Sequence, residues 1–215
     1  MLIGDDDPGH VVGGWSGHVR LKVELSTQLQ QFSWACRRAI FSRSDDSGGD
    51  TEAAGPFESS QVQSVKEPHI SLTKAFYLHE HQINEFVREI ENCVGGMGCF
   101  AVGFGQLSTY LAANKRRGFV AVDVNYGMES VRRVLDRVDC VMEKFGQRKF
   151  FRAPLLHVSL LSVDLEADAV GEMGKVGATL GTAMDEEIAL LAAVRIDQVE
   201  CVFGNRKFSI SLDAE

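Results

Sequence analysis

No run of apolar residues in this 215-residue chain approaches the roughly 18 that a membrane-spanning helix needs. The first residues, 1–7, also lack the basic and apolar regions of a signal peptide. These two absences favour a protein of the cytosolic or nuclear side with no membrane partner.

Cysteine is present without any pairing pattern. The five cysteines are an odd number, are widely spaced and contain no C-x-x-C motif; they are Cys36, Cys93, Cys99, Cys140 and Cys201. This spacing predicts neither a disulfide framework nor a zinc site. In a reducing compartment we expect small, buried, reduced side chains.

An excess of positive charge is missing too, since the formal net charge is −8. Phosphate contacts need Lys and Arg, so this charge argues against an extensive, sequence-independent nucleic-acid surface. Most of the negative charge lies in two segments, residues 5–7 and 43–58, and the rest of the chain is nearly neutral. A near-neutral body can still hold a local basic site for a single RNA end.

What remains is the composition of an ordinary globular protein, with 45% hydrophobic and 24% charged residues. Residues 1–14 are polar and glycine-rich and are expected to be disordered. Residues 15–215 are expected to form a single domain, interrupted by a disordered loop at 42–60 that is too polar to bury anything.

Two segments that are 88 positions apart share one pattern. Residues 69–72 read His-Ile-Ser-Leu, and residues 157–160 read His-Val-Ser-Leu. In a strand, His and Ser then lie on one face and the β-branched residue on the other. A chain with 6 histidines carries fewer than one His-x-Ser by chance, so two copies favour function. The alternative is a pair of half-buried strand histidines that are satisfied by local hydrogen bonds.

Two imidazoles that face each other can act as general base and general acid near neutral pH. On RNA, one would take the proton of a ribose 2′-OH as its oxygen attacks the phosphorus. The other would protonate the departing 5′ oxygen, and two Ser hydroxyls would stabilise the phosphate charge. The candidate catalytic residues are therefore His69, Ser71, His157 and Ser159, and no metal or other cofactor is required. A symmetric pair leaves the assignment open; we place His157 as base and His69 as acid.

The paired motifs resemble those of the two-histidine (2H) phosphoesterases, and their surroundings resemble the U6 snRNA phosphodiesterase family. The matching segments run in order through the chain from residue 13: residues 14–19 (Gly-Trp-Ser-Gly-His-Val), 69–72, 77–83, 86–87, 149–154 (Lys-Phe-Phe-Arg-Ala-Pro) and 203–209 (Phe-Gly-Asn-Arg-Lys-Phe-Ser). The resemblance implies an α+β, 2H phosphoesterase-like fold. Two pseudo-symmetric lobes, each with an antiparallel sheet and helices, would enclose the active-site cleft.

The resemblance also implies a nuclear 3′-to-5′ exonuclease that trims the uridine tail of U6 snRNA. DNA is not an expected partner, a monomer is expected, and the product end is a 2′,3′-cyclic phosphate or its opened form. Phe151 occupies the position at which the family typically carries a base-stacking Tyr, and Phe keeps the aromatic face but lacks the hydroxyl. Two alternatives stay open: a 2H esterase for cyclic phosphates or 2′,5′-oligonucleotides, and a non-catalytic RNA-binding module.

Hydrophobic periodicity predicts the remaining elements. Strands are predicted at 19–25, 100–111 and 118–124, and a hairpin is predicted from 194–203 and 207–212. One helix is predicted to begin at 26 or 27, and two others to span 78–94 and 126–145. A fourth helix, at 166–187, is interrupted by glycines. The basic turn 112–117 is either a solvated tip or an RNA contact. The other histidines, His10, His18, His79 and His81, are expected at the surface or at helix caps.

Overall fold

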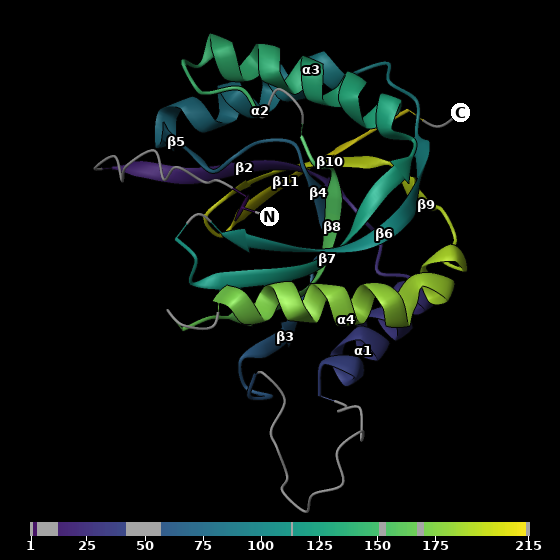
Figure 1. Ribbon diagram of the computed structural model, residues 1–215. Helices are drawn as coiled ribbons and strands as arrows, with labels where there is room; N and C mark the ends of the chain where they lie inside the picture. Colours follow the sequence, from purple (N-terminus) through teal and green to yellow (C-terminus); the bar gives the residue numbers. More distant parts are fainter. Residues whose placement is uncertain are drawn as a thin grey trace, which may run out of the picture.

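The computed structural model describes residues 2–3, 13–41, 57–112, 114–150, 154–166 and 170–213 (Figure 1). The helices are α1 (Thr27–Phe41), α2 (Glu80–Val94), α3 (Met128–Lys144) and α4 (Val170–Ala189). The strands are β1 (Leu2–Ile3), β2 (Gly14–Lys22), β3 (Val62–Ser64), β4 (His69–Ser71), β5 (Phe76–His79), β6 (Phe100–Ala112), β7 (Arg117–Tyr126), β8 (His157–Asp164), β9 (Val194–Ile196), β10 (Gln198–Phe203) and β11 (Arg206–Ser211).

The strands form two sheets, each carrying one of the predicted His-x-Ser segments. The His69 sheet has the order β11-β10-β2-β4, and β5 also pairs with β2. The His157 sheet has the order β1-β6-β7-β8-β3, and β9 also pairs with β6. All pairs are antiparallel except β1 with β6. Strands β4 and β8 contact each other, so the two sheets meet at the two histidine strands. The α+β class predicted from the sequence is confirmed.

The lobes are not the two halves of the chain. Helices α2 and α3 pack together above the His69 sheet in Figure 1, and α1 and α4 pack together beneath the His157 sheet. Each lobe contains elements from both halves of the chain. The first half contributes α1 and β3 to the lobe of the His157 sheet, whereas the C-terminal β10 and β11 belong to the His69 sheet. The order of elements in the sequence does not reveal this exchange.

A cluster of phenylalanines joins α2 to the His69 sheet. The ring of Phe86 lies 5.2 Å from Phe76 of β5, 5.8 Å from Phe203 of β10 and 5.1 Å from Phe145. Gly17 of β2 lies beneath this cluster, where a Cβ atom would be 2.6 Å from the Phe203 ring. The absence of a side chain at Gly17 is therefore what lets the rings close over β2.

The glycine-rich helix α4 is continuous, and the predicted interruption at 166–187 is wrong. A Cβ atom at Gly177 would lie 2.7 Å from Thr109 of β6. In the opposite direction, a Cβ atom at Gly118 of β7 would lie 2.7 Å from Met173 of α4. Close packing on the His157 sheet compensates for the low helix propensity of glycine, which is why tertiary contact overrides the local preference.

The strand predicted at 19–25 lies earlier in the chain, as β2 (Gly14–Lys22). Two further boundaries differ because a strand pairs with another partner than expected. The helix predicted at 78–94 begins at Glu80, because Leu78 and His79 pair with Trp15 and Gly14 as part of β5. The strand predicted at 194–203 is split, since β9 pairs with β6 while β10 pairs with β2 and β11. A tertiary partner, rather than local periodicity, fixes both boundaries.

The segments expected to be disordered are partly ordered. Within residues 1–14, Leu2 and Ile3 add a short strand to the edge of β6, and Gly14 begins β2. Within 42–60, Phe57 is buried and 58–61 form a turn. The other residues of these two segments, 1, 4–12 and 42–56, lie outside the described residues. Of the cysteines, Cys36, Cys99 and Cys201 are buried as expected, whereas Cys140 is exposed.

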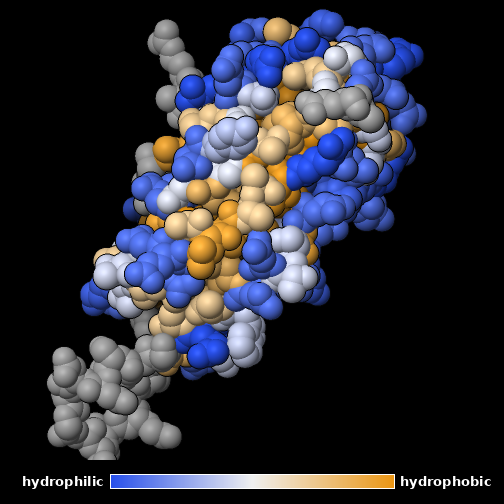
Figure 2. Space-filling view, turned by 90° about the vertical axis from the view of Figure 1, so that its right-hand side faces the viewer, coloured by the Kyte–Doolittle hydropathy of each residue, from blue (hydrophilic) through white to orange (hydrophobic). Residues whose placement is uncertain are grey.

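The side of the molecule that carries β9 and the end of α4 shows apolar surface gathered in a band between charged flanks (Figure 2). Leu190, which follows α4, is 76% exposed. None of the helices among the described residues is both long enough and apolar enough to span a bilayer.

Candidate functional site

The two His-x-Ser strands have the alternation that the sequence predicts. Ile70 and Val158 are fully buried, whereas both histidines and both serines are half-buried on the opposite face. Because β4 and β8 contact each other, the structure brings His69, Ser71, His157 and Ser159 to one seam between the sheets.

The same backbone contact holds both imidazoles. The Nδ1 atom of His69 lies 2.9 Å from the carbonyl oxygen of Glu67, and Nδ1 of His157 lies 2.7 Å from the carbonyl oxygen of Leu155. A carbonyl oxygen only accepts, so each Nδ1 carries the hydrogen. In the neutral ring each Nε2 then keeps a lone pair, so it can accept a proton as a general base does. Once protonated, the same Nε2 can donate that proton as a general acid does.

Burial lowers the pKa of both His69 and His157, but their neighbours differ. For His69, the Glu67 carbonyl and the negative charge of Glu200 oppose the effect of burial, while the positive charges of Arg20 and His157 lower the pKa further. For His157, both the Leu155 carbonyl and Asp123 oppose the effect of burial on the pKa. Both rings are therefore neutral at pH 7 in the free protein, and Arg20 and His157 oppose a positive charge on His69, whereas Asp123 favours one on His157.

Tyr110 and Asp123 support the ring of His157. The Tyr110 and His157 rings are stacked, with centroids 4.3 Å apart. The Tyr110 hydroxyl donates to Asp123 at 2.5 Å, and Asp123 also accepts from Ser108 at 2.7 Å and Gln106 at 2.9 Å. Asp123 is the residue opposite His157 in the pairing of β7 with β8. This arrangement places a carboxylate behind the stacked pair and fixes one side of the imidazole.

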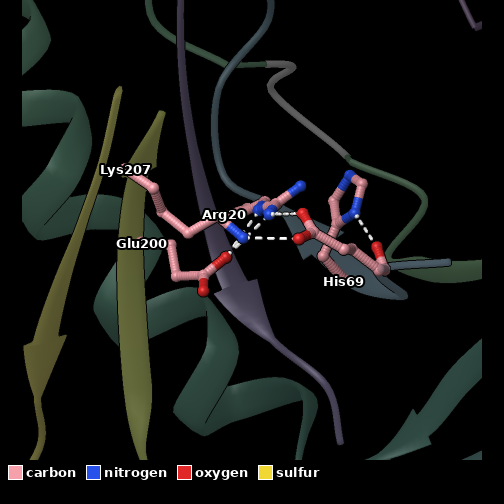
Figure 3. A network of polar contacts seen from close by, with 5 residues as sticks. Arg20, His69, Glu200 and Lys207 are labelled. Atoms are coloured by element: carbon pink, nitrogen blue, oxygen red, sulfur yellow. Dashed lines mark hydrogen bonds and ion pairs between the residues drawn. The ribbon is translucent and has the colours of Figure 1, made fainter. Parts of the chain in front are cut away.

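A different arrangement supports His69 (Figure 3). Arg20 and Lys207, which come from β2 and β11, each bind the Glu67 carboxylate at 2.6 Å. Arg20 also binds the buried Glu200 at 2.8 Å. The hydrogen bonds from Lys207 and Arg20 lower the pKa of Glu67 to about 2. Glu67, whose backbone carbonyl orients His69, is therefore fixed in place by the ion pairs of its side chain with Arg20 and Lys207.

His18 belongs to the site, and its expected place at the surface or at a helix cap is wrong. Its Nε2 lies 3.2 Å from the Ser71 hydroxyl, and its ring meets that of His69 edge-on with centroids 5.3 Å apart. Burial first, then His69 and Arg20, lower the pKa of His18 to about 3, so the ring stays neutral. Alternation along β2 places His18 and Arg20 on one face, but only the pairing of β2 with β4 shows that this face also carries Ser71.

The remaining predicted residues are less central. Phe151 and His10 lie outside the described residues. His79 is the N-cap of α2, as expected, and its backbone N–H bonds Gln82. In the basic turn, Lys115 is exposed and Arg117 pairs with Asp164. The described part of the chain contains no group of three or more His, Cys, Asp or Glu side chains that could hold a metal ion.

A family model described as "HVSL: Uncharacterised conserved protein" matches residues 8–211. The chain belongs to the HVSL family. The four letters of that name are the residues His157-Val158-Ser159-Leu160.

The relatives agree with this assignment. The U6 snRNA phosphodiesterase 1 of Xenopus laevis is 28% identical over 155 residues, which are 69% of this chain and 60% of that protein. The same enzyme of Rattus norvegicus is 26% identical over 205 residues, which are 94% of this chain and 71% of that protein. The aligned residues of this chain thus span about 60 to 70% of the length of these two relatives. The resemblance to the U6 snRNA phosphodiesterase family is confirmed.

Solved structures confirm the fold. Kluyveromyces marxianus Usb1 superposes with a TM-score of 0.65 at 17% identity, covering 94% of this chain and all of that one. The same protein with uridine monophosphate gives a TM-score of 0.62 at 17% identity, with the same coverage. Escherichia coli LigT in its apo form gives 0.51 at 9% identity, covering 94% of this chain and 96% of that one. At such identities the likeness concerns the fold alone.

Proposed function

We propose that this HVSL protein is an RNA phosphodiesterase in which His69 and His157 act as general acid and general base. The observation that carries the proposal is the equivalent geometry of the two rings. Each donates Nδ1–H to the carbonyl two residues before it, which leaves Nε2 available for proton transfer. The two strands that carry them touch at the seam between the sheets.

The proposed reaction is an attack by a ribose 2′ oxygen on the adjacent phosphodiester. The base takes the 2′-OH proton, the new bond forms between the 2′ oxygen and phosphorus, and the bond from phosphorus to the 5′ oxygen breaks. The acid delivers a proton to that departing oxygen. The products are a 2′,3′-cyclic phosphate and a free 5′-OH, and no metal is needed in any step.

The charged neighbours favour His157 as the base and His69 as the acid. When the base accepts its proton it becomes positively charged, and Asp123 behind Tyr110 favours that charge on His157. When the acid gives up its proton it becomes neutral, and Arg20 favours the neutral form of His69. A bound phosphodiester, which carries one negative charge, raises the pKa of both rings and so helps His69 to be protonated.

Ser71 and Ser159 are proposed to donate to the non-bridging phosphate oxygens, on which negative charge increases in the transition state. Among the residues that the structure describes, the Ser159 hydroxyl has no hydrogen-bond partner. Ser71 faces His18. If His18 donates its Nε2 hydrogen to Ser71, the Ser71 hydroxyl keeps its own hydrogen for the phosphate.

The proposed substrate is the 3′ end of U6 snRNA, from which terminal uridines are removed in the nucleus. Two findings support this choice: the relatives are U6 snRNA phosphodiesterases, and Usb1, which shares the fold, is known in a structure with uridine monophosphate. Phe151 is proposed to stack on the terminal base. A 3′-to-5′ direction follows if the departing group is the last nucleoside of the chain.

The test is incubation with EDTA and an RNA that ends in uridines, beside the same RNA with a 2′-deoxy residue at the penultimate position. Stepwise shortening that survives EDTA and stalls at the deoxy position is the expected result. Loss of activity in EDTA would contradict the metal-free mechanism. Opening of small cyclic nucleotides without shortening would indicate a cyclic-phosphate esterase, and RNA binding without turnover would indicate a binding module.

A further inference from the structure

A pocket of about 350 Å³ lies beside His69 on the polar face of the His69 sheet. Its cationic lining comes from β2, from the segment before β4 and from β11: Arg20, Lys22, Lys66 and Lys207. Small-ligand sites begin at about 300 Å³, so the pocket has room for a phosphate and part of a nucleotide.

The lining of the pocket includes close neighbours of His69. Lys22 is the direct cross-strand partner of His69 in the pairing of β2 with β4, so the two side chains lie on the same face. Glu67 and Pro68, which immediately precede His69, also line the pocket. Lys22, Glu67 and Pro68 therefore connect the lining of the pocket to His69.

Two of the four cations lack a close acidic partner. Arg20 is bound to Glu67 and Glu200, and Lys207 is bound to Glu67. Lys22, in contrast, approaches Glu24 only to 3.9 Å. Lys66 is exposed and makes no ion pair with any residue that the structure describes.

Those two lysines stand out in a chain of net charge −8. The four cations also outnumber the three carboxylates of the pocket, which belong to Glu24, Glu67 and Glu200. The excess charge therefore attracts an anion rather than a cation.

We propose that this pocket binds the RNA phosphate next to the one that is cleaved, through Lys22 and Lys66. The inference rests on the proposed function and adds a second phosphate site to it. Two sources supply the same chemistry: the phosphate upstream of the cleaved one, or a phosphate at the 3′ end of the departing nucleotide. Lysine is suited to either phosphate, because its ammonium group acts as a point charge and can bind a phosphate in many orientations.

The test is binding by calorimetry of a dinucleotide, 2′-deoxyuridine joined to uridine, that cannot be cleaved because it lacks the attacking 2′-OH. The dinucleotide is compared with forms carrying one extra phosphate at the 5′ end or at the 3′ end. We expect one of the two extra phosphates to lower Kd about fivefold, the scale of one charge contact, and to steepen the salt dependence of log Kd by about 0.7. The end that gives the gain identifies the source.

The matched variants are Lys22→Met and Lys66→Met, with Lys175→Met as control because Lys175 is paired with Glu172 on α4. The gain from the extra phosphate should be lost in the first two and kept in the control. No gain at either end in the wild-type protein, or a gain that both pocket variants keep, would overturn the inference. Cleavage of the all-ribose dinucleotide is measured separately, so a protein that binds the extra phosphate but does not cleave would contradict the proposed function alone.

Discussion

The phenol ring of Tyr110 lies flat against the imidazole of His157, with centroids 4.3 Å apart and planes at 23°. The hydroxyl of the same Tyr donates a hydrogen bond to Asp123. Tyr110 therefore links the Asp123 carboxylate to the imidazole, in place of a direct hydrogen bond between Asp123 and His157. The direct partner of Nδ1 is instead the Leu155 carbonyl. This leaves His157 with a fixed tautomer and a nearby negative charge.

Asp123→Asn should lower the pKa of His157 further, because Asp123 raises it in the wild-type protein. With His157 as base, activity rises as His157 loses its proton, so the acid-side limb of the pH–rate profile should move to lower pH. A weaker base should also reduce kcat roughly tenfold. The measurement is kcat against pH, with Asp164→Asn as control because Asp164 lies at the far end of β8, the strand that begins at His157. A shift of the alkaline limb instead would reverse the assignment of base and acid.

His69→Ala and His157→Ala should each reduce cleavage at least about 10³-fold while the protein stays folded, since each removes one of two required proton transfers. The matched control is His81→Ala, an exposed histidine on α2. Cleavage is measured on a uridine-ended RNA and folding by circular dichroism. Near-normal activity in both catalytic variants would refute the two-histidine mechanism.

Glu67→Gln should lower kcat about three- to tenfold, because Arg20 and Lys207 lose the anion that fixes the segment carrying the carbonyl partner of His69. The same change removes a negative charge from the cationic pocket, so KM for RNA should stay level or fall. A fall in kcat without a rise in KM separates positioning from binding. Glu80→Gln, whose partner Arg206 is 3.8 Å away, is the control, and an increase in KM at constant kcat would contradict this role.

The sequence was sufficient to predict the two His-x-Ser strands, because their pattern is local. A His-x-Ser strand shows its polar face in four residues, and both copies lie as predicted. The contribution of His18 was not predictable in this way, because its partner Ser71 is 53 positions away and only the pairing of β2 with β4 brings them together. The same holds for the exchange of α1 and β10 between lobes, which depends on long-range sheet pairing.

Gly174→Ala and Gly177→Ala are expected to have opposite effects on stability. Both glycines lie in α4, but a Cβ atom at Gly174 would meet nothing within 4 Å, whereas one at Gly177 would lie 2.7 Å from Thr109. Gly174→Ala should therefore stabilise the protein by about 0.5–1 kcal/mol through helix propensity. Gly177→Ala should destabilise it by about 1–3 kcal/mol through overpacking. Urea unfolding of both variants checks this, and equal effects would mean that α4 does not pack closely on β6.

The neutral state of His18 predicts a loss of stability in acid. The pKa of His18 is about 3 in the folded protein, against 6.5 for the free side chain. Below about pH 6.5 the unfolded chain binds a proton that the folded protein cannot, so the free energy of unfolding should fall as the pH drops from 6.5 toward 3. His69 and His157 act in the same direction, because their pKa values are lowered too. For His18 alone the loss between these two pH values is on the order of 4 kcal/mol.

His18→Gln removes the titration but keeps a donor for Ser71, so it should flatten the dependence of stability on pH between 6.5 and 4 without abolishing cleavage. The measurement is urea unfolding at several pH values, with His81→Gln as control because His81 is exposed on α2. The control should keep the wild-type slope. If His18→Gln also kept that slope, His18 would take up its proton in the folded protein over the same pH range as in the unfolded chain. The lowered pKa of His18 would then be refuted.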